Sequence, residues 1–369
     1  MKKIFFVTGE LSGDRLAAWY LQRLQQQESD LYVEAIGGDF LLNHGAKIYK
    51  RFEELNVVGI VEILKHIVRL LSLMRALCVY ITQQGFDEVV VVDFPGFNLR
   101  LIKKLKKMAP HLKITYLSPP QMWCWGAWRV HGLKRNADRI IVLYPFEVAW
   151  YRQRGVHVEW LGTPVAEMVG AHRAPVQEKK LFVALFPGSR VSEIKSLLPL
   201  FLRAAALIKK RYPAVQFYLP LAQSIRPELL EAVVQQHHLQ DVWQSVTPVF
   251  GEEKKYEILQ QCCVALTKPG TVTLELALLA VPAVVAYYVP WLTYFLARLV
   301  VKVKYMSLPN LIVDREIFKE IIQYDCTSDH LAHELEKVLQ MFNHDRSGYR
   351  RMLDELDHVV TLITQNQQK

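Results

Sequence analysis

Cysteine is scarce in this sequence, and no two of its five cysteines form a C-x-x-C pair. Their number is odd, and three of them stand in apolar surroundings. We therefore expect buried free thiols in a reducing compartment rather than a disulfide framework. The five are Cys78, Cys124, Cys262, Cys263 and Cys326.

The common signatures of metal and nucleotide sites are also missing. Neither D-x-D nor H-E-x-x-H occurs, and His330 and His333 have no second pair of ligands nearby. The absence of G-x-x-x-x-G-K-S/T argues against a P-loop NTPase, and the glycines of "TGELSGD" lack the dinucleotide spacing G-x-G-x-x-G. We therefore expect neither a metal ion nor a bound cofactor.

Apolar stretches long enough to target or span a membrane are nearly absent. The start of the chain, "MKKIFFVTGELSGD", has too few apolar residues for a signal peptide. Residues 276–297 carry no charge over 22 residues, but Pro282 and Pro290 divide them into a helix end, a short strand and the start of another helix. We therefore expect a cytoplasmic protein, attached at most to a membrane surface.

The length of 369 residues suits two domains, and 51% hydrophobic with 22% charged residues is typical of a globular protein. Lys and Arg number 45 against 36 Asp and Glu, which gives a formal charge of +9. This excess fits nucleic acid, an anionic membrane surface or a phosphorylated substrate, and does not choose among them.

Short apolar runs alternate with helix-length segments along the chain, which predicts parallel sheets covered on both faces. A polar stretch, "GAHRAPVQEKK" (170–180), separates two such series. We therefore expect an α/β fold of two doubly wound, Rossmann-like domains, residues 1–170 and 178–345, that face each other across a cleft. Residues 346–369 are expected to form a helix that packs on the first domain or makes dimer contacts. The predicted strands are 4–8, 33–36, 89–92, 114–117, 140–143, 158–160, 182–186, 216–219, 264–267 and 283–287.

Ligands of such folds bind beyond the carboxyl ends of the strands, and one strand end of the second domain has the character of a phosphate site. In "LFVALFPGSRVSEI" (181–194), Gly188, Ser189 and Arg190 open a helix. Its free N–H groups suit an anion, and Arg190 adds a charged donor. The alternative is an ordinary strand-to-helix turn with a surface arginine.

A second turn of the same domain repeats the arrangement. In "VALTKPGTVTLE" (264–275), Gly270, Thr271 and Thr273 open a helix, and Glu275 follows one turn later, where a carboxylate suits ribose hydroxyls. The alternative is a capping threonine with an acidic residue near the helix start. Two such turns in one domain favour a nucleotide diphosphate site.

Strand ends of the first domain carry carboxylates that suit a general base. Glu10 and Asp14 follow the first strand, and Asp93 follows the valine run of "EVVVVDFPGFN" (88–98). A hydroxyl that attacks an anomeric carbon needs a base, and a strand tip holds a carboxylate rigidly. An ordinary aspartate is a weak base, so the site needs partial desolvation. The alternative for all three is capping of a helix.

The segment 62–83 predicts an amphipathic helix. A wide apolar side suits a membrane interface or acyl chains, whereas the alternative is a helix packed on the sheet. Basic and aromatic residues at 100–107, 123–135 and 298–304 suit anionic headgroups. The candidate membrane or acyl-binding residues are Ile63, Ile67, Leu70, Met74 and Leu77, with Arg69 on the polar side.

Eight motifs occur in the order seen in the lipid-A-disaccharide synthase family, and the chain resembles that family from residue 4 to about residue 330. They are "GELSGD" (9–14), "NVVGIVEIL" (56–64), "VDFPGFN" (92–98), "SPPQMWCW" (118–125), "YPFE" (144–147), "FPGSRVSEI" (186–194), "KPGTVTLE" (268–275) and "SLPNLI" (307–312).

The resemblance implies a metal-independent, inverting glycosyltransferase of family 19 with the GT-B fold. Such an enzyme joins UDP-2,3-diacylglucosamine to 2,3-diacylglucosamine 1-phosphate through a β-1,6 linkage and releases UDP. The resemblance also implies a role in lipid A, and hence lipopolysaccharide, biosynthesis. It places the protein on the cytoplasmic face of the inner membrane among anionic lipids, without a nucleic-acid partner and with a homodimer as an option.

The resemblance assigns a catalytic role to Asp93, places Arg190 at the diphosphate and Glu275 at the ribose, and adds Asn310 of "SLPNLI" to the donor site. The chain also departs from the family pattern. Lys268 and Pro269 replace a small residue and serine, Tyr288 replaces a basic residue, Thr163 replaces histidine, and Gly96 replaces an acidic residue. These departures bear on sugar recognition.

Two other functions are open at this point. Another GT-B glycosyltransferase, or a UDP-sugar epimerase of the same fold, would use a different acceptor, although the apolar helix at 62–83 speaks against a purely water-soluble one. A basic membrane- or RNA-binding protein would explain the charge but not the paired phosphate turns. Binding of UDP without added metal distinguishes these functions.

Overall fold

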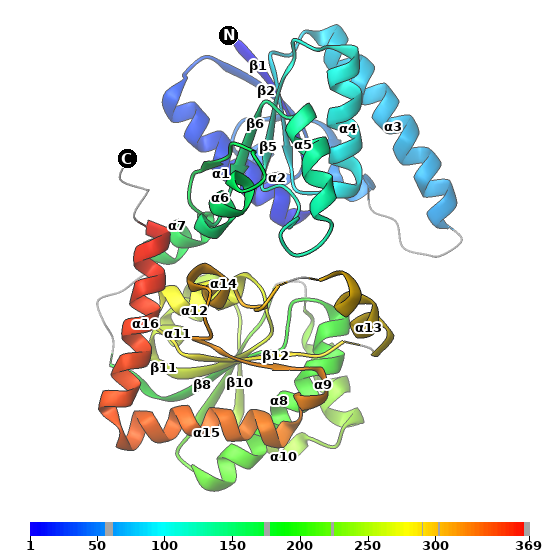
Figure 1. The fold of residues 1–369 in the computed structure, drawn as a ribbon. Helices are drawn as coiled ribbons and strands as arrows, with labels where there is room; N and C mark the ends of the chain where they lie inside the picture. The colour runs from blue at the N-terminus through cyan, green and yellow to red at the C-terminus, as the bar shows by residue number, and fades with distance from the viewer. Residues whose placement is uncertain (56–61, 173–177, 223–224, 290, 302, 365–369) are drawn as a thin grey trace. The chain divides into compact units, whose positions relative to one another are not determined.

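The structure is a computed structural model, and it describes residues 1–55, 62–172, 178–222, 225–289, 291–301 and 303–364. The chain divides into two compact units, Met1–Pro164 (unit 1) and Val165–Lys369 (unit 2). Unit 1 runs from blue to green and unit 2 from green to red (Figure 1).

Unit 1 is built on a parallel sheet. Among the described residues this sheet has seven strands in the order β3-β2-β1-β4-β5-β6-β7, and every neighbouring pair is parallel. The strands are β1 (Lys2–Val7), β2 (Leu31–Gly37), β3 (Lys47–Arg51), β4 (Glu88–Val92), β5 (Lys113–Leu117), β6 (Arg139–Val142) and β7 (Glu159–Trp160).

Alternate residues of the central strands enter apolar cores on opposite faces of this sheet. Phe5 and Val7 of β1 pack in the core that includes helices α3 and α4, whereas Ile4 and Phe6 pack in the core that includes α1. Both faces are therefore covered by helices, as the uninterrupted apolar runs predicted. The helices are α1 (Leu11–Gln27), α2 (Asp39–Asn43), α3 (Glu62–Gln84), α4 (Pro95–Met108), α5 (Val130–Asn136) and α6 (Pro145–Arg152), with short 3₁₀ turns at Phe52–Leu55 and Ala127–Arg129.

Unit 2 repeats this architecture. Its described residues form a six-stranded parallel sheet in the order β10-β9-β8-β11-β12-β13. The strands are β8 (Lys180–Phe186), β9 (Gln216–Pro220), β10 (Val246–Val249), β11 (Cys262–Thr267), β12 (Ala283–Tyr287) and β13 (Lys319–Ile322). The helices are α7 (Pro164–Ala171), α8 (Val191–Arg211), α9 (Pro227–Gln236), α10 (Gln240–Trp243), α11 (Glu252–Gln261), α12 (Thr271–Leu278), α13 (Trp291–Val300), α14 (Leu308–Val313), α15 (Ser328–His344) and α16 (Arg346–Thr364), with a 3₁₀ turn at Gln323–Asp325.

Each sheet has one point where the strand order reverses. In unit 1 the chain proceeds outward from β1 to one edge and then from β4 to the other, so the reversal lies between β1 and β4. In unit 2 it lies between β8 and β11. Ligands of doubly wound sheets bind at this crevice, beyond the carboxyl ends of the two strands. All the strand-end turns singled out in the sequence follow one of these four strands.

The sequence did not predict three of the strands, and all three are edge strands: β3, β10 and β13. The sequence of β3, "KIYKR", is mostly polar, and β10 contains Pro248, which an edge tolerates because one side makes no ladder hydrogen bonds. A strand paired on one side carries a weaker apolar signal than a buried central strand.

The uncharged stretch 276–297 forms the end of α12, the strand β12 and the first part of α13, as predicted. Over the described residues, no helix combines the length and the apolar character that crossing a membrane requires.

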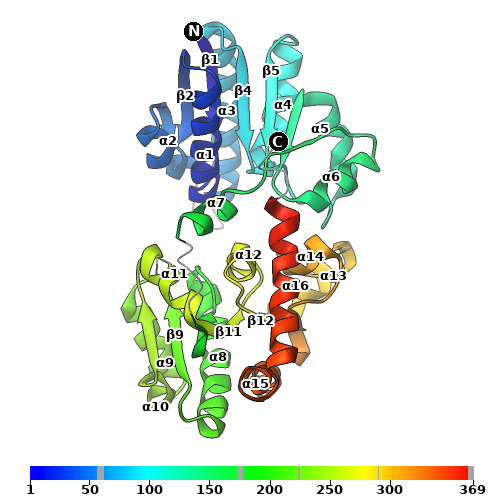
Figure 2. The same ribbon diagram turned by 90° about the vertical axis from the view of Figure 1, so that its left-hand side faces the viewer.

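The C-terminal helix α16, drawn in red in Figure 2, packs against α12, α14 and α15 of unit 2. Its Tyr349 donates a hydrogen bond of 2.8 Å to the backbone carbonyl of Cys263, and Glu355 pairs with Arg315. The unit boundary lies just after Pro164, the first residue of α7, whereas the sequence placed the end of the first domain at residue 170. Packing of residues 346–369 on unit 1 stays a prediction.

Candidate functional site

The reversal point of unit 1 brings two carboxylate residues to neighbouring strand ends. Glu10 follows β1, Asp93 follows β4, and the two strands pair in register from Ile4 to Val7. Gly9 allows this approach, since a Cβ on Gly9 would collide with the ring of Phe94. The ring therefore lies against the backbone that leads into Glu10.

Asp93 has a strained backbone that its neighbours hold in place. Asp93 and Phe94 both adopt left-handed conformations, with φ of 44° and 46°, which non-glycine residues seldom occupy. The carbonyl oxygen of Asp93 accepts hydrogen bonds of 2.8 Å from the Asn98 side-chain amide and of 2.8 Å from the Tyr116 hydroxyl. Its backbone N–H donates to Leu117 on β5 at 3.2 Å. These bonds hold the backbone of Asp93 in place.

The environment of Asp93 makes its carboxylate a better base than an ordinary aspartate. Burial, followed by the negative charge of Glu10, raises the pKa of Asp93 to about 6, against a smaller opposing effect of a hydrogen bond from the Phe94 backbone. The partial desolvation that a catalytic aspartate requires is thus present. This group matches a proton acceptor near neutral pH.

The two carboxylates predicted alongside Asp93 have different surroundings. Glu10 is exposed, its side chain makes no cap hydrogen bond to α1, and it accepts a hydrogen bond of 2.5 Å from the Ser12 hydroxyl. Asp14 is fully buried and accepts hydrogen bonds from the backbone N–H groups of Gly38 (2.7 Å) and Phe40 (3.0 Å). Both of its oxygens cap the start of α2, and burial raises its pKa. Asp14 therefore has a role in the fold, and its catalytic role stays a prediction.

Glu147 of the "YPFE" motif is a buried carboxylate whose importance the sequence did not reveal. It accepts hydrogen bonds from the backbone N–H groups of Leu143 (3.1 Å) and Tyr144 (3.0 Å) and from the Trp123 indole (3.1 Å). Burial raises its pKa to about 7. Glu147 thus ties the loop after β5 to the start of α6, and the residue pattern of a capping box was the available signal.

The first predicted phosphate turn of unit 2 follows β8. Gly188 has φ of 139°, and a Cβ there would collide with the side chain of Glu193, so glycine is required. Glu193 lies in the first turn of α8 and accepts hydrogen bonds from the backbone N–H groups of Ser189 (2.9 Å) and Arg190 (3.2 Å). The side chain of Arg190 is 76% exposed. The turn thus has the kind of donors expected of an anion site, but the Glu193 carboxylate occupies the N–H groups of Ser189 and Arg190.

The second predicted turn follows β11 and is joined to the first. The Lys268 ammonium lies 2.6 Å from Glu193, and its backbone N–H donates to the Phe186 carbonyl at 3.1 Å. Thr271 at the start of α12 is exposed, whereas Thr273 is fully buried.

The Thr273 hydroxyl serves the fold. It donates to the Gly270 carbonyl at 2.7 Å and accepts from the Leu308 N–H at 3.3 Å, which ties α12 to α14. The side chain is thus buried and bonded on both sides, and its part in ligand binding stays a prediction. Gly270 and Thr271, at the start of α12, are the exposed candidates at this turn.

Glu275 lies one turn further along α12 and is 8% exposed. The Lys255 ammonium lies 2.8 Å from its Oε2, and the Tyr256 hydroxyl donates to the same oxygen at 3.2 Å. Within the described part of the chain, Oε1 makes no hydrogen bond. The carboxylate is therefore held in place with one oxygen available as an acceptor.

Asn310 has a structural position that the sequence did not predict. It is fully buried; its amide nitrogen donates to the Phe318 carbonyl and to Glu320, and its oxygen accepts from the N–H groups of Ile317 and Phe318, all at 2.8–2.9 Å. Its hydrogen-bonding capacity is filled within unit 2. The side chain thus holds α14 to β13, and its assignment to donor binding stays a prediction.

The predicted membrane face of α3 is partly buried. Met74 and Leu77 are 5% and 0% exposed and pack in the core of unit 1, and Leu70 packs against the same core. These residues pack in the manner of the alternative, a helix packed on the sheet, and their assignment to acyl binding stays a prediction. The side chains of Ile63, Ile67 and Arg69 lie outside the described residues.

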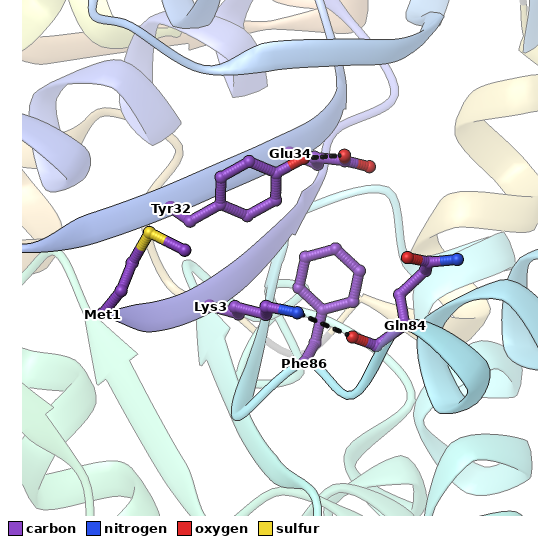
Figure 3. A pocket seen from close by; sticks show the side chains of 6 residues that line it. All are labelled: Met1, Lys3, Tyr32, Glu34, Gln84 and Phe86. Carbon is purple, nitrogen blue, oxygen red and sulfur yellow. Dashed lines mark hydrogen bonds between the residues drawn. The ribbon is translucent and has the colours of Figure 1, made fainter.

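A shallow pocket of about 200 Å³ lies beside the amino-terminal parts of β1 and β2, away from the strand carboxyl ends (Figure 3). Burial alone would raise the pKa of its Glu34, but hydrogen bonds from Tyr32, Tyr80 and Lys47 outweigh burial and lower that pKa. Glu34, the one carboxylate that lines this pocket, is thus already hydrogen-bonded to neighbouring side chains. In the parts of the chain that the structure describes, no group of three or more His, Cys, Asp and Glu side chains is arranged to hold a metal ion.

Comparison with known proteins identifies close relatives over the whole chain. Residues 4–369 match the family described as "Lipid-A-disaccharide synthetase". The chain is 34% identical to a lipid-A-disaccharide synthase of Acinetobacter baylyi over 98% of this chain and 97% of that protein. It is 35% identical to one of Alkalilimnicola ehrlichii over 95% of this chain and 92% of that protein.

Solved structures with the same fold are more distant in sequence. UDP-GlcNAc 2-epimerase of Neisseria meningitidis, bound to UDP-GlcNAc, matches with a TM-score of 0.63 at 11% identity, over 99% of this chain and all of that one. MurG of Acinetobacter baumannii matches with a TM-score of 0.58 at 13% identity, over 99% of this chain and all of that one. At such identities the likeness shows the GT-B-like fold alone.

Proposed function

The chain belongs to the lipid-A-disaccharide synthase family and is a glycosyltransferase of lipid A biosynthesis that acts on lipid A precursors; from this we propose how its residues carry out the reaction. The donor is UDP-2,3-diacylglucosamine and the acceptor is 2,3-diacylglucosamine 1-phosphate. The acceptor's O6 attacks the anomeric carbon of the donor, and the new C1–O6 bond forms as the bond to the UDP oxygen breaks. The hydroxyl proton passes to a base, and UDP leaves with the electron pair.

The half-buried carboxylate of Asp93, at the end of β4 beside the end of β1, is the observation that carries this proposal. Its surroundings raise its pKa to about 6. At neutral pH the carboxylate is mostly ionised and is a stronger base than an aspartate in water. The hydrogen bonds from Asn98 and Tyr116 to its backbone hold that backbone in place, which suits a base that meets a bound hydroxyl. Asp93 is the proposed base, and the neighbouring charge of Glu10 supports its basicity.

Unit 2 is proposed to hold the UDP part of the donor. The starts of α8 and α12 lie on both sides of the reversal point, where backbone N–H groups and helix dipoles favour a diphosphate. Gly188, Ser189 and Arg190 serve one start, and Gly270 and Thr271 serve the other. The open Oε1 of Glu275 is the proposed acceptor for the ribose hydroxyls.

Membrane attachment is proposed for unit 1 on the basis of its exposed aromatic residues. Trp125 and Trp128 are 47% and 69% exposed, and the Arg129 guanidinium lies over the Trp125 ring at 4.1 Å. Such residues suit the interface of an anionic bilayer, from which lipid-linked substrates are drawn. The proposed place is the cytoplasmic face of the inner membrane. Flotation with phosphatidylglycerol vesicles tests membrane attachment, and Trp128→Ser should reduce the fraction of protein bound to the vesicles.

A homodimer is also proposed, and light scattering tests it.

The function is tested by mixing the two diacylated substrates with the protein in detergent and EDTA. We expect disaccharide 1-phosphate and UDP in equal amounts, because each transfer releases one UDP. The reaction should proceed in EDTA, because helix starts and Arg190 meet the diphosphate charge at the proposed donor site. Absence of product, or strict dependence on an added metal ion, would contradict the proposed mechanism.

A further inference from the structure

Lys268 connects the two helix starts of unit 2. It is the first residue after β11, and its backbone N–H bonds to the last residue of β8, Phe186. From this position its ammonium reaches across the reversal point to Glu193 of α8, at 2.6 Å. Since β8 and β11 pair directly, the backbone of Lys268 is held in a fixed position relative to the start of α8, where Glu193 lies.

Glu193 presents a problem for anion binding. Its Oε2 occupies the backbone N–H groups of Ser189 and Arg190, two of the donors that a phosphate would use. Gly188 is needed because the glutamate side chain lies directly against it. The carboxylate suits the positive end of the α8 dipole, yet it places a negative charge at a site proposed for a diphosphate.

Lys268 supplies the compensating charge in a partly buried place. Its side chain is 24% exposed and that of Glu193 is 18% exposed, so solvent screens their attraction less than it would at the surface. Arg190 is the other cation at this turn, but its guanidinium lies 3.9 Å from Glu193 and is mostly exposed. Lys268 is thus the cation that holds Glu193, and Arg190 is left to face a ligand.

We propose that Lys268 is a positioning residue for donor binding: it pairs with Glu193 and offsets that negative charge, so that a nucleoside diphosphate can bind at the paired helix starts through Arg190 and the remaining donors. This inference rests on the proposed location of the UDP site. Its effect on the diphosphate passes through Glu193, not through a contact of its own.

A double-mutant cycle tests this role, with UDP as the probe and isothermal titration calorimetry at low salt as the measurement. Lys268→Gln should weaken UDP binding about tenfold, because it leaves the Glu193 charge unpaired beside the diphosphate. Glu193→Gln should bind UDP at least as well as the unchanged protein. The double variant should return to within about threefold of the unchanged protein, because the repelling charge is gone.

Other outcomes would overturn the inference. If the double variant binds UDP as weakly as Lys268→Gln, Lys268 contacts the diphosphate itself; if Lys268→Gln binds normally, it has no part in donor binding. Lys210→Gln removes an equal charge from the exposed far end of α8 and should change nothing. Melting curves identify variants that fail to fold, and Lys268→Met then replaces Lys268→Gln.

Arg190→Ala separates this inference from the proposed site. If Arg190→Ala leaves the UDP affinity unchanged, the diphosphate assignment at α8 fails, whatever the cycle gives. If Arg190→Ala weakens UDP binding and Lys268→Gln does not, only the role of Lys268 fails.

Discussion

Glu10 and Asp93 follow neighbouring parallel strands of unit 1, and the charge of Glu10 adds to burial in raising the pKa of Asp93 to about 6. Two carboxylates in unlike surroundings, one exposed and one partly buried, are a recurrent arrangement in sites that need a base near neutral pH. The strained backbone of Asp93 is held by bonds to its own carbonyl, so the side chain itself is available for chemistry.

Replacing Asp93 with Asn should abolish most turnover. Asn tolerates a left-handed backbone and keeps the shape of the side chain, but it cannot accept the proton, so we expect a decrease in kcat of about 10²- to 10⁴-fold. UDP affinity should stay within about threefold, because the proposed donor site lies on unit 2. A steady-state assay with both substrates, together with UDP titration, measures the two effects. Turnover within tenfold of the unchanged protein would remove Asp93 from the role of base.

The same substitution should stabilise the fold above pH 6. Since burial raises the folded-state pKa of Asp93 above its unfolded value, the folded protein binds the proton more strongly, and ionisation between about pH 4 and pH 6 lowers the free energy of unfolding. Asn removes this cost. Melting temperatures at pH 7.5 and pH 4 should show a gain at the higher pH only. A loss at pH 7.5 would indicate that the carboxylate serves the fold.

Replacing Glu10 with Gln should shift the pH dependence of kcat/KM. Asp93 must be ionised to act as a base, so activity should rise with pH through the pKa of Asp93 and then level off. Without the charge of Glu10 this pKa falls, and the acidic limb should move to lower pH. Glu28→Gln, a change at the exposed far end of α1, should leave the limb in place. An unmoved limb in Glu10→Gln would show that the limb does not report Asp93.

Replacing Tyr116 with Phe should leave the Asp93 carboxylate in the chain but make its orientation less fixed. The Asp93 carbonyl would keep its bond to Asn98 and lose the one to Tyr116, at a cost of about 1 kcal/mol in folding stability. We expect kcat to fall several-fold with little change in KM, because orientation of the base is affected and binding is not. Tyr80→Phe removes a bond to Glu34 and is the matched control. Equal kcat in both variants would argue against orientation through the carbonyl.

Replacing Asp14 with Asn should harm folding rather than catalysis. One oxygen of the buried carboxylate would become an N–H₂ group facing a backbone N–H of the 38–40 turn, at a cost of about 1–3 kcal/mol. Turnover per folded molecule should stay within about twofold. Asp39→Asn, in the same helix start but at an exposed carboxylate, should cost far less. A specific loss of kcat in folded Asp14→Asn would place Asp14 in the catalytic site.

The fold was predictable because its signals are local. Buried strands such as β4 are visible in the sequence as short apolar runs. Glycine, proline and capping residues mark the turns after β1, β4, β8 and β11. The family resemblance then supplied the substrates, which the periodic pattern alone does not specify. The edge strands were missed because one side of each is exposed and their sequences are polar or contain proline.

Side-chain roles were less predictable, because the deciding partners are distant in sequence. The sequence allowed a catalytic role for Asp14 but did not show its acceptor role toward Gly38 and Phe40, 24 and 26 residues away. Asn310 is a similar case, because its oxygen bonds to the segment before β13 and its nitrogen bonds to Phe318 and to Glu320 of β13. Lys268 was visible in the sequence of the second turn, but its bond to Glu193, 75 residues away, was not.

Replacing Glu275 with Gln should reduce the recognition of ribose. The carboxylate is held through Oε2 by Lys255 and Tyr256, and a charged acceptor binds a hydroxyl more strongly than an amide does. The unchanged protein should bind UDP about tenfold more tightly than 2′,3′-dideoxy-UDP, and Glu275→Gln should narrow this ratio to about threefold or less. Glu257→Gln, on the exposed side of α11, should leave the ratio unchanged. Calorimetric titration with both nucleotides gives the four affinities. An undiminished ratio in Glu275→Gln would mean that the buried carboxylate serves Lys255 and the packing of α12, and that another group recognises the ribose.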